Sequence, residues 1–418
     1  MKKNRTALNI MLILEAVILI VVLVFAALSG AAGRTGGNSS SGEEAETSTE
    51  GGVQGVIKEE DAKESTEDSS ETSEEDAEET EVSDAYEEDR IEFSEEVEDL
   101  LSEMSEEELV AQLFVTTPEE LTGVDAVTIA GEGTRSSLDT YPVAGLVYSS
   151  ANFADASQIK ELLSGTQSYS QEITGLDMFL IVEELGGSAS PVAEAAGYDV
   201  QESPSALGET GSTDSVSEAA SARASYLSEA GFTMVLGPIA DTSAGSDDDF
   251  DALTYGSSAL DIADYVAADV SALQSGGLLS ALQAFPGVQS AEEDYSAYQS
   301  AIDAGVACIQ VSGIADSSVT GSDSLPCTLS AGATETLRGT MGFTGLLMTA
   351  DLGGESVTSY CGSAEAAVEA VKAGMNLLYV SDGFEDCYSA VLEAVQSGEI
   401  TETQLQNAAG RILTEKLS

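Results

Sequence analysis

The sequence predicts an α/β fold, a TIM-type (β/α)8 barrel preceded by a single N-terminal transmembrane helix and a disordered acidic linker. Two observations predict the barrel. Short apolar runs rich in β-branched residues recur from about residue 91 onward, and amphipathic helical stretches separate most of them. This alternation is typical of βα units around a parallel sheet, and eight units in roughly 320 residues suit a closed barrel. A doubly wound open sheet is the alternative.

The first segment, residues 1–32, is expected to be a cytoplasmic tip and a membrane anchor. Residues 10–28 are apolar except for Glu15, which approaches the ~20 residues that cross a bilayer. Three basic residues precede this run: Lys2, Lys3 and Arg5. The positive-inside bias then places the N-terminus in the cytoplasm and the rest of the chain outside. A cleaved signal peptide is the alternative, because small residues occupy positions 27–32.

The next segment, residues 33–90, is expected to be a disordered linker. It consists mainly of Gly, Ser, Thr, Glu and Asp and has hardly any large apolar side chains. Such a segment cannot bury enough surface to offset its ordering entropy, and its like charges extend it. The folded domain is therefore assigned to residues 91–418.

Eight candidate strands and five longer candidate helices follow one another along this domain. The strands are expected at 110–115, 143–148, 178–183, 233–239, 278–284, 307–312, 345–350 and 376–380. The helices are expected at 157–169, 215–229, 259–275, 363–373 and about 401–417. No glycine-rich phosphate-binding fingerprint follows a strand, so the sequence predicts no nucleotide and no other cofactor.

The charge of the chain limits its partners. The sequence has 75 acidic and 14 basic residues, a formal net charge of −61. This charge repels nucleic acid and anionic lipid headgroups, so we expect no nucleic-acid partner and membrane contact through the N-terminal helix only. Histidine is absent. No imidazole is therefore available as an acid, a base or a metal ligand, and no metal site is expected.

Four cysteines lie in the last third of the chain: Cys308, Cys327, Cys361 and Cys387. They lack the paired spacing of a zinc site. Outside the cell they can form disulfides, and we predict that Cys327 and Cys361, which follow the sixth and seventh strands, lie within bridging distance. The alternative is that the cysteines are small buried apolar residues.

A series of short motifs occurs at strand ends and helix starts across residues 100–418. They are Met104–Phe114, Tyr141–Leu146, Val182–Gly187, Gly237–Asp241, Ala284–Gly287, Ala301–Val306, Leu337–Arg338, Gly342–Gly345 and Ala373–Leu378. In this order and spacing they resemble the family 3 glycoside hydrolases of the β-N-acetylhexosaminidase type. The resemblance implies a hydrolase of glycosidic bonds whose site lies at the carboxyl ends of the barrel strands.

The positions that carry catalysis in this family are altered. The family's Asp nucleophile, in an S-D-D-L motif after the seventh strand, corresponds to Ala350, whose methyl group cannot form a glycosyl-enzyme ester. The acid/base histidine of a D-S-H triplet corresponds to Ser296, while the triplet's Asp remains as Asp294. Positions where the family has arginine, lysine or histidine are also changed: Ser188, Leu253, Gln283, Ala284 and Val288.

Several acids remain as candidates for the site. Glu183 corresponds to a family aspartate that hydrogen-bonds sugar hydroxyls, and Asp241 ends a strand, so both are candidate ligand-binding residues. Asp351 is a candidate substitute nucleophile, although strand alternation would turn it away from the pocket and favours a loop or helix-cap carboxylate. Asp294 is a candidate weak acid.

The sequence therefore predicts a membrane-anchored, catalytically degenerate glycoside hydrolase domain for carbohydrate binding or scaffolding at the cell surface. Its expected ligand is a glycan containing N-acetylglucosamine, or peptidoglycan. Two alternatives remain open. One is an active glycosidase that hydrolyses β-N-acetylglucosaminides with relocated carboxylates, and the other is an acidic surface spacer without a ligand.

Overall fold

A computed structural model describes residues 85–243, 248–287 and 294–418. The predicted transmembrane helix and most of the predicted linker lie outside the described residues. Within the described part of the chain, no helix is long and apolar enough to cross a membrane.

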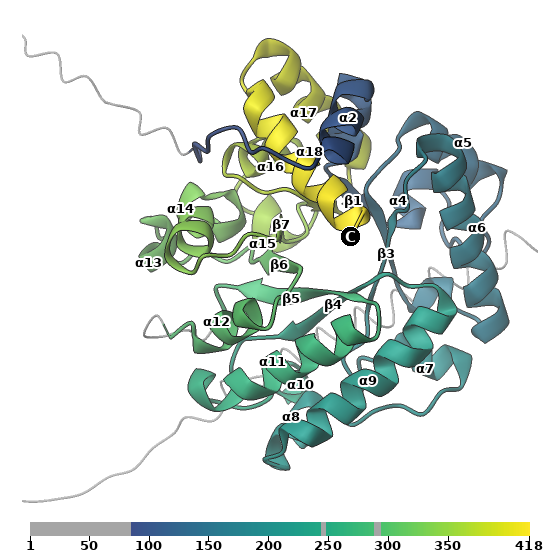
Figure 1. Ribbon diagram of the computed structural model, residues 1–418, viewed down its shortest axis with the longest axis vertical. Helices are drawn as coiled ribbons and strands as arrows, with labels where there is room; N and C mark the ends of the chain where they lie inside the picture. Colours follow the sequence, from purple (N-terminus) through teal and green to yellow (C-terminus); the bar gives the residue numbers. More distant parts are fainter. Residues whose placement is uncertain (1–84, 244–247, 288–293) are drawn as a thin grey trace, which may run out of the picture. The chain divides into compact units, whose positions relative to one another are not determined.

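Eight parallel strands form the centre of the domain (Figure 1). They are β1 Phe114–Thr116, β2 Gly145–Tyr148, β3 Phe179–Glu183, β4 Met234–Ile239, β5 Leu279–Phe285, β6 Cys308–Val311, β7 Leu346–Met348 and β8 Leu378–Val380. Strand β1 pairs with both β2 and β8, and a parallel bridge between Met348 and Leu377 links β7 to the start of β8. The sheet is thus an almost closed barrel, as predicted, and not an open doubly wound sheet.

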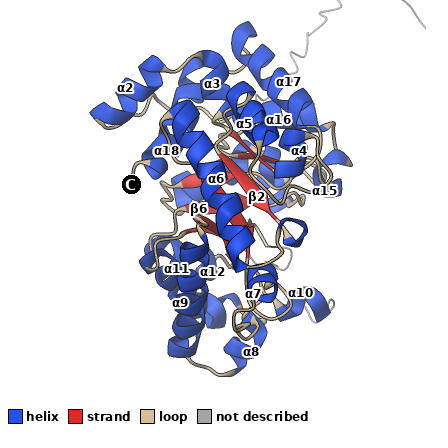
Figure 2. Cartoon of the chain, turned by 90° about the vertical axis from the view of Figure 1, so that its right-hand side faces the viewer, coloured by secondary structure: helices blue, strands red, loops and turns tan. Residues whose placement is uncertain are grey.

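Helices surround the strands on the outside (Figure 2). The α-helices are α2 Glu95–Glu103, α3 Glu106–Ala111, α4 Pro118–Thr122, α5 Glu132–Thr140, α6 Ala156–Thr174, α7 Pro191–Ala196, α8 Pro204–Glu209, α9 Thr213–Ala230, α10 Asp248–Ala252, α11 Ala259–Ser275, α12 Ser296–Asp303, α13 Ser317–Thr320, α14 Ala331–Glu335, α15 Glu355–Thr358, α16 Ser363–Lys372, α17 Phe384–Ser397 and α18 Glu402–Lys416. Short 3-10 turns lie at Ser150–Asn152 and Cys327–Leu329, and a π-helical turn lies at Thr336–Thr340. All five predicted helices are present.

The strand prediction needs one larger correction, at its start. The apolar run 110–115 does not form one strand, because its first residues complete α3 and β1 begins at Phe114. Helix α3 begins at Glu106, because Ser105 and Glu108 form a capping box that satisfies the first backbone N–H groups of the helix. The other seven predicted strands match the observed ones to within a few residues.

The segment 85–94, which we call the N-terminal strap, packs against the last helices of the domain. The backbone N–H of Tyr86 donates to the carbonyl of Lys372 at 2.8 Å. The N–H of Ile91 donates to Oδ1 of Asn407 at 2.9 Å. Glu88 forms an ion pair with Arg411 at 2.6 Å. Residues 85–90, assigned to the linker from the sequence, therefore belong to the folded domain, because these polar contacts hold a segment with few apolar side chains.

The cysteines are all free thiols. Cys327 and Cys361 are therefore not joined by a disulfide; Cys327 is buried in the core and Cys361 is partly buried. Burial raises the pKa of Cys327 to about 12 and that of Cys387 to about 11, so both stay protonated near neutral pH. Three of the four cysteines thus fit the alternative of small buried residues.

Candidate functional site at the carboxyl end of the barrel

A cavity of about 890 Å³ lies at the carboxyl ends of the strands. We call it the mouth cavity. Its lining comes from strands β2 to β8 and the loops that follow them: Val147, Tyr148, Ser149, Ser150, Glu183, Ser188, Ala189, Pro191, Leu236, Phe250, Leu253, Gln283, Ala284, Gln310, Ser312, Gly313, Ala350, Asp351 and Tyr379. A (β/α)8 barrel carries its functional groups at this end. The cavity is therefore the candidate site.

Glu183 is the predicted ligand-binding acid that the structure places in the cavity. It is the last residue of β3 and the only exposed residue of that strand, because the four before it are buried in the barrel. One carboxylate oxygen accepts a hydrogen bond from Nε2 of Gln283 at 3.1 Å. Gln283 comes from β5, so two strands hold this pair at the rim of the cavity.

Ala350 and Asp351 both line the cavity. Strand alternation predicts that only one of them would, but β7 ends at Met348 and both residues lie in the loop after it. The Asp351 carboxylate accepts hydrogen bonds from the backbone N–H groups of Gly353 and Ser381, at 3.0 and 2.9 Å, and from the Ser381 hydroxyl. Asp351 therefore fastens the loop after β7 to the end of β8.

Three polar residues that the sequence analysis did not select also line the cavity: Gln310, Ser312 and Tyr379. Burial, followed by the charges of Asp351 and Glu183, raises the pKa of Tyr379 to about 12, so its phenol stays a neutral hydrogen-bond donor. Nε2 of Gln310 donates to the carbonyl of Thr349 at 3.2 Å. The Ser312 side-chain oxygen is buried and has no hydrogen-bond partner among the described residues. Their positions at the ends of predicted strands are the sequence signal that could have identified these three residues as part of the site.

The remaining predicted site residues do not line the cavity. Asp241 is 5% exposed and packs against Gly287, where a Cβ atom would lie 2.2 Å from its Oδ1. Asp241 therefore braces the Phe-Pro-Gly segment after β5. Asp294 accepts a hydrogen bond from the backbone N–H of Ser296 at 3.1 Å and another from its hydroxyl, just before α12. Residues 288–293, which include Val288, lie outside the described residues.

A buried polar network supports the cavity wall from behind. Arg223 of α9 and Asp269 of α11 form an ion pair at 2.6 Å, and each is 1% exposed. The Arg223 guanidinium also donates to the carbonyl of Glu184 at 2.9 Å, directly after β3. The Glu184 carboxylate accepts from the first backbone N–H groups of α7 and from the Tyr226 hydroxyl. Burial raises the pKa of Glu184. These groups face the protein, not the cavity.

Residues 107–415 match the family described as Glycosyl hydrolase family 3 N terminal domain. The chain belongs to this family. The match covers the whole barrel and confirms the resemblance predicted from the motifs. No curated protein sequence matches the chain.

Solved structures of family 3 proteins resemble this barrel. A β-N-acetylglucosaminidase of family 3 from Paenibacillus sp. str. FPU-7 superposes with a TM-score of 0.69 at 25% identity, over 75% of this chain and 62% of that one. The chain thus spans less than two thirds of that enzyme. A family 3 member from Mycobacterium smegmatis superposes with a TM-score of 0.65 at 23% identity, over 76% of this chain and 98% of that one. A β-N-acetylhexosaminidase from Beutenbergia cavernae superposes with a TM-score of 0.65 at 19% identity, over 76% of this chain and 99% of that one.

Several positions selected from the family resemblance lie together in this family 3 barrel. Four positions where the resemblance implies a cation or a histidine line the mouth cavity: Ser188, Leu253, Gln283 and Ala284. In the part of the chain that the structure describes, the lining residues include two carboxylates and no lysine or arginine. The cavity can therefore offer hydrogen-bond acceptors, neutral donors and the apolar side chains of Phe250 and Leu253 to a ligand.

Proposed function

We propose that this family 3 barrel binds N-acetylglucosamine-containing glycans or peptidoglycan in the mouth cavity without hydrolysing them. The observation that carries the proposal is the place of Ala350 on the cavity wall. A retaining glycosidase needs a carboxylate nucleophile and a second group that protonates the leaving oxygen. Ala350 supplies no carboxylate, and Ser296 supplies no acid.

The two carboxylates that do line the cavity have other partners. Asp351 accepts hydrogen bonds from Ser381 and Gly353, which hold it in the loop after β7. Glu183 lies beside Gln283. Binding needs less than catalysis, because a sugar ring requires only an apolar face and a few convergent polar groups. Phe250, Leu253 and Tyr379 supply the apolar face, and Glu183 and Ser312 supply the polar groups.

A turnover assay tests the absence of hydrolysis. We expect the purified domain to release no chromophore from an aryl β-N-acetylglucosaminide. Ala350→Asp returns a nucleophile without an acid, and Ser296→His returns an acid without a nucleophile, so neither change alone should restore turnover. Residues that act as a unit are non-additive, and the double variant should gain at most trace activity.

One observation favours the alternative of an active glycosidase: Asp351 lines the cavity. Efficient turnover by the unmodified domain, abolished by Asp351→Asn, would assign the nucleophile to Asp351 and refute the proposal. Calorimetric titration with the tetrasaccharide of N-acetylglucosamine distinguishes a glycan-binding domain from an acidic spacer without a ligand. A domain that binds no glycan at all is an acidic spacer.

The proposed place of action is the outer side of a membrane, with the barrel tethered by the residues that precede the N-terminal strap. This proposal is supported by the apolar run 10–28 and the basic residues before it. In intact cells, added protease should remove the barrel while a tag at the N-terminus stays protected. A barrel that survives protease until the cells are lysed would contradict this location.

A further inference from the structure

We propose that the mouth cavity selects an amino sugar whose nitrogen is unacetylated and protonated, so that its ligand is a partly de-N-acetylated glycan. This inference rests on the proposed function, because it names the class of glycan that the same cavity takes. It is carried by three features of the lining: its charge, the engagement of each carboxylate, and one buried hydroxyl without a partner.

Among the described residues, the lining carries two carboxylates, Glu183 and Asp351, and no lysine or arginine, while the chain has no histidine. A carboxylate removed from water costs free energy unless a charge or hydrogen bonds compensate it. A neutral ligand that fills the cavity displaces water from these groups and brings no opposite charge. A sugar hydroxyl can donate a hydrogen bond to the carboxylate but carries no charge of its own, whereas an ammonium group donates the hydrogen bond and also brings the counter-charge.

Glu183 is the carboxylate that remains open to a ligand. Asp351 accepts three hydrogen bonds from the loop after β7 and the end of β8, whereas Glu183 is exposed and accepts one bond, from Gln283 at 3.1 Å. The Gln283 amide is neutral, so it does not cancel the charge of Glu183. Tyr379 does not cancel it either, because a phenol never carries a positive charge. Burial and the two nearby carboxylates raise the pKa of Tyr379 to about 12, so it stays a neutral hydrogen-bond donor.

Ser312 indicates that the ligand also carries hydroxyl groups. Its side chain is 7% exposed and lines the cavity, and its oxygen has no hydrogen-bond partner among the described residues. An unpaired buried hydroxyl costs about 1–3 kcal/mol, which a ligand hydroxyl relieves. A simple polyamine has no hydroxyl for this position. An amino sugar carries both the ammonium group for Glu183 and the hydroxyls for Ser312.

Acetylation of the nitrogen removes this match. An N-acetyl group replaces the ammonium charge by a neutral amide, so Glu183 is desolvated without a counter-charge. The cavity should therefore bind glucosamine units more tightly than N-acetylglucosamine units, and added salt should weaken only the former.

Calorimetric titration of the domain with four compounds tests this inference. The probes are the tetrasaccharides of glucosamine, of N-acetylglucosamine and of glucose, and spermine as a cation without hydroxyls. We expect glucosamine tetrasaccharide to bind about tenfold more tightly than the other two sugars. We expect spermine to bind more weakly than glucosamine tetrasaccharide.

Matched variants separate the cavity from the acidic surface as a whole. Glu183→Gln removes one charge from the lining and should lower glucosamine affinity about tenfold. It should weaken the other two sugars less, because a glutamine still accepts a hydrogen bond from a sugar hydroxyl. Glu132→Gln removes one charge from the exposed start of α5, outside the lining, and should change nothing. Ser312→Ala should weaken all three sugars and leave spermine unchanged.

The outcomes are distinct. Preference for the N-acetylated sugar would overturn this inference and leave the proposed function standing. Equal losses in Glu183→Gln and Glu132→Gln, or spermine binding as tight as glucosamine, would show attraction to the acidic surface alone and overturn it. Failure of every sugar to bind would overturn both proposals.

Discussion

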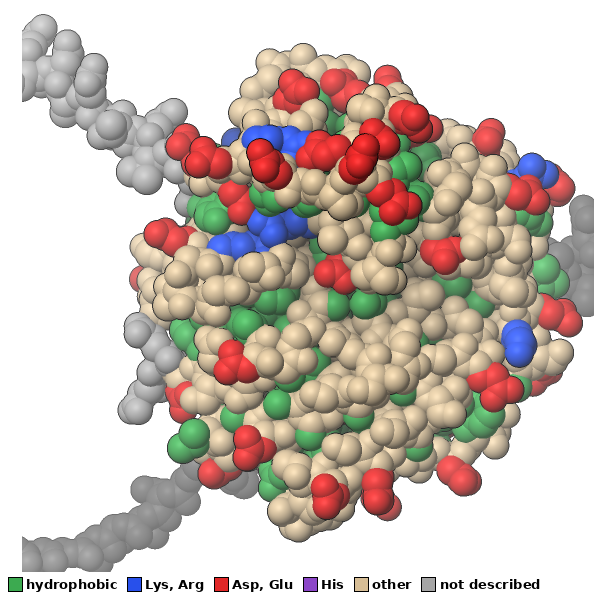
Figure 3. All heavy atoms as spheres, viewed as in Figure 1, with side chains coloured by type: hydrophobic (Ala, Val, Ile, Leu, Met, Phe, Trp, Pro, Cys, Tyr) green, Lys and Arg blue, Asp and Glu red, His purple; other side chains and the backbone are tan. Residues whose placement is uncertain are grey.

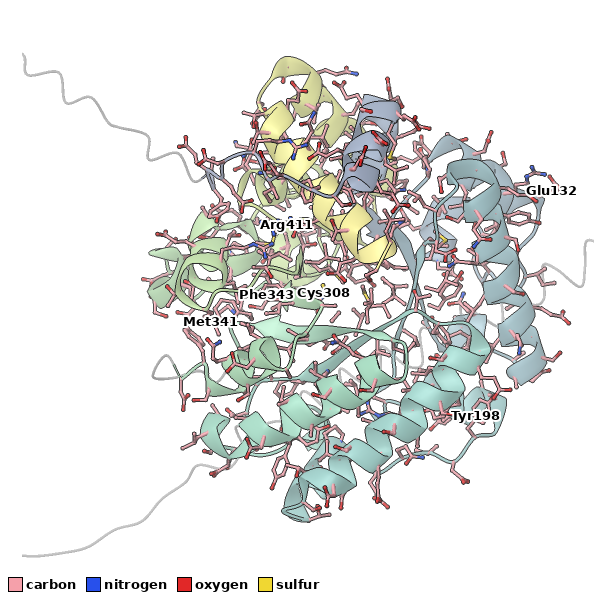
Figure 4. All side chains as sticks on the ribbon, viewed as in Figure 1. Glu132, Tyr198, Cys308, Met341, Phe343 and Arg411 are labelled. Carbon is pink, nitrogen blue, oxygen red and sulfur yellow. The ribbon has the colours of Figure 1, made fainter. Side chains whose placement is uncertain are left out.

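The two ends of the barrel differ in where the chain places its few cations. At the amino end, Arg338, Arg411 and Lys416 bind strand starts and the loops before them. Arg411 donates to the carbonyl of Thr344, and the Arg338 guanidinium lies 5.4 Å from the centre of the Phe343 ring; Arg411 and Phe343 are labelled in Figure 4. At the carboxyl end, the mouth cavity has two carboxylates and no cation among its lining residues. On the face drawn in Figure 3, acidic side chains are scattered widely and basic ones occur in few places.

The cations of the amino end have structural partners. Arg338 donates to the carbonyls of Phe343 and Gly345 at 3.0 and 2.7 Å, and burial lowers its pKa to about 9. The ammonium group of Lys416 lies 5.3 Å from the centre of the Phe179 ring and donates to Gln112 at 2.9 Å. The comparison teaches that this chain uses its rare cations to close the barrel and leaves its functional end acidic.

The largest expected effect tests whether Arg223, which donates to the carbonyl of Glu184 directly after β3, has a structural role. Arg223→Met should lower the free energy of unfolding by about 3–5 kcal/mol, because it leaves the buried Asp269 carboxylate without its counter-charge. Urea unfolding measures the loss. The double variant Arg223→Met/Asp269→Leu should be clearly more stable than the single one. A single variant of normal stability that has lost glycan binding would instead place Arg223 in the site.

The next, smaller effect tests the acidic character of the mouth cavity itself. Gln283→Lys places a cation beside Glu183 in the mouth cavity, where the present amide nitrogen lies 3.1 Å from the carboxylate. It should lower the affinity for glucosamine tetrasaccharide about tenfold, since the new ammonium group takes the place of the ligand's. Calorimetry checks this, with Gln283→Met as the uncharged control. Tighter glucosamine binding by the lysine variant would contradict an acidic binding site.

The smallest effect concerns Lys416 at the amino end. Burial lowers the pKa of Lys416 in the folded protein to about 7, whereas a lysine in the unfolded chain has a pKa of about 10.4. Between these values the unfolded chain binds a proton that the folded chain does not, so the free energy of unfolding rises with pH. Below about pH 7 both states are protonated and the cost of burial is fully present.

We expect the stability difference between the unmodified protein and Lys416→Met to rise in favour of the unmodified protein from about pH 7 to about pH 10. The rise should be smaller than a shift of about three pH units implies, because Lys416 is partly exposed and water screens its charge. Urea unfolding at several pH values measures it. A difference that stays flat over this range would show that Lys416 keeps its charge through contact with water.

The barrel could be predicted because its strands are buried on both faces and read as continuous apolar runs. The run 234–239, for example, is buried throughout. The boundary between the linker and the barrel could not be predicted from the sequence. Polar contacts such as the ion pair of Glu88 with Arg411 hold the N-terminal strap, and no local sequence pattern marks these contacts. The predicted disulfide failed for a similar reason, since neighbouring loops do not fix how deeply each cysteine lies.

The site was predicted in part. Motif order led to Glu183, Ala350 and Asp351, and all three line the mouth cavity. Ser312 and Tyr379 were missed because a hydroxyl at a strand end has no special sequence pattern, and only the packed barrel shows which strand ends converge. Asp241 was selected as a strand-end acid, yet it packs against Gly287, a contact that depends on the path of the chain after β5.

The N-terminal strap has a consequence for how the protein is made. The strap binds α16 and α18, and β1 pairs with β8, so the first and last parts of the domain complete each other. During synthesis the early strands leave the ribosome long before their partners exist. Contacts this distant in sequence form slowly, and unpaired strand edges invite aggregation meanwhile. We therefore expect chains that lack α18 to depend on chaperones, because the N-terminal strap then has lost its partners on that helix.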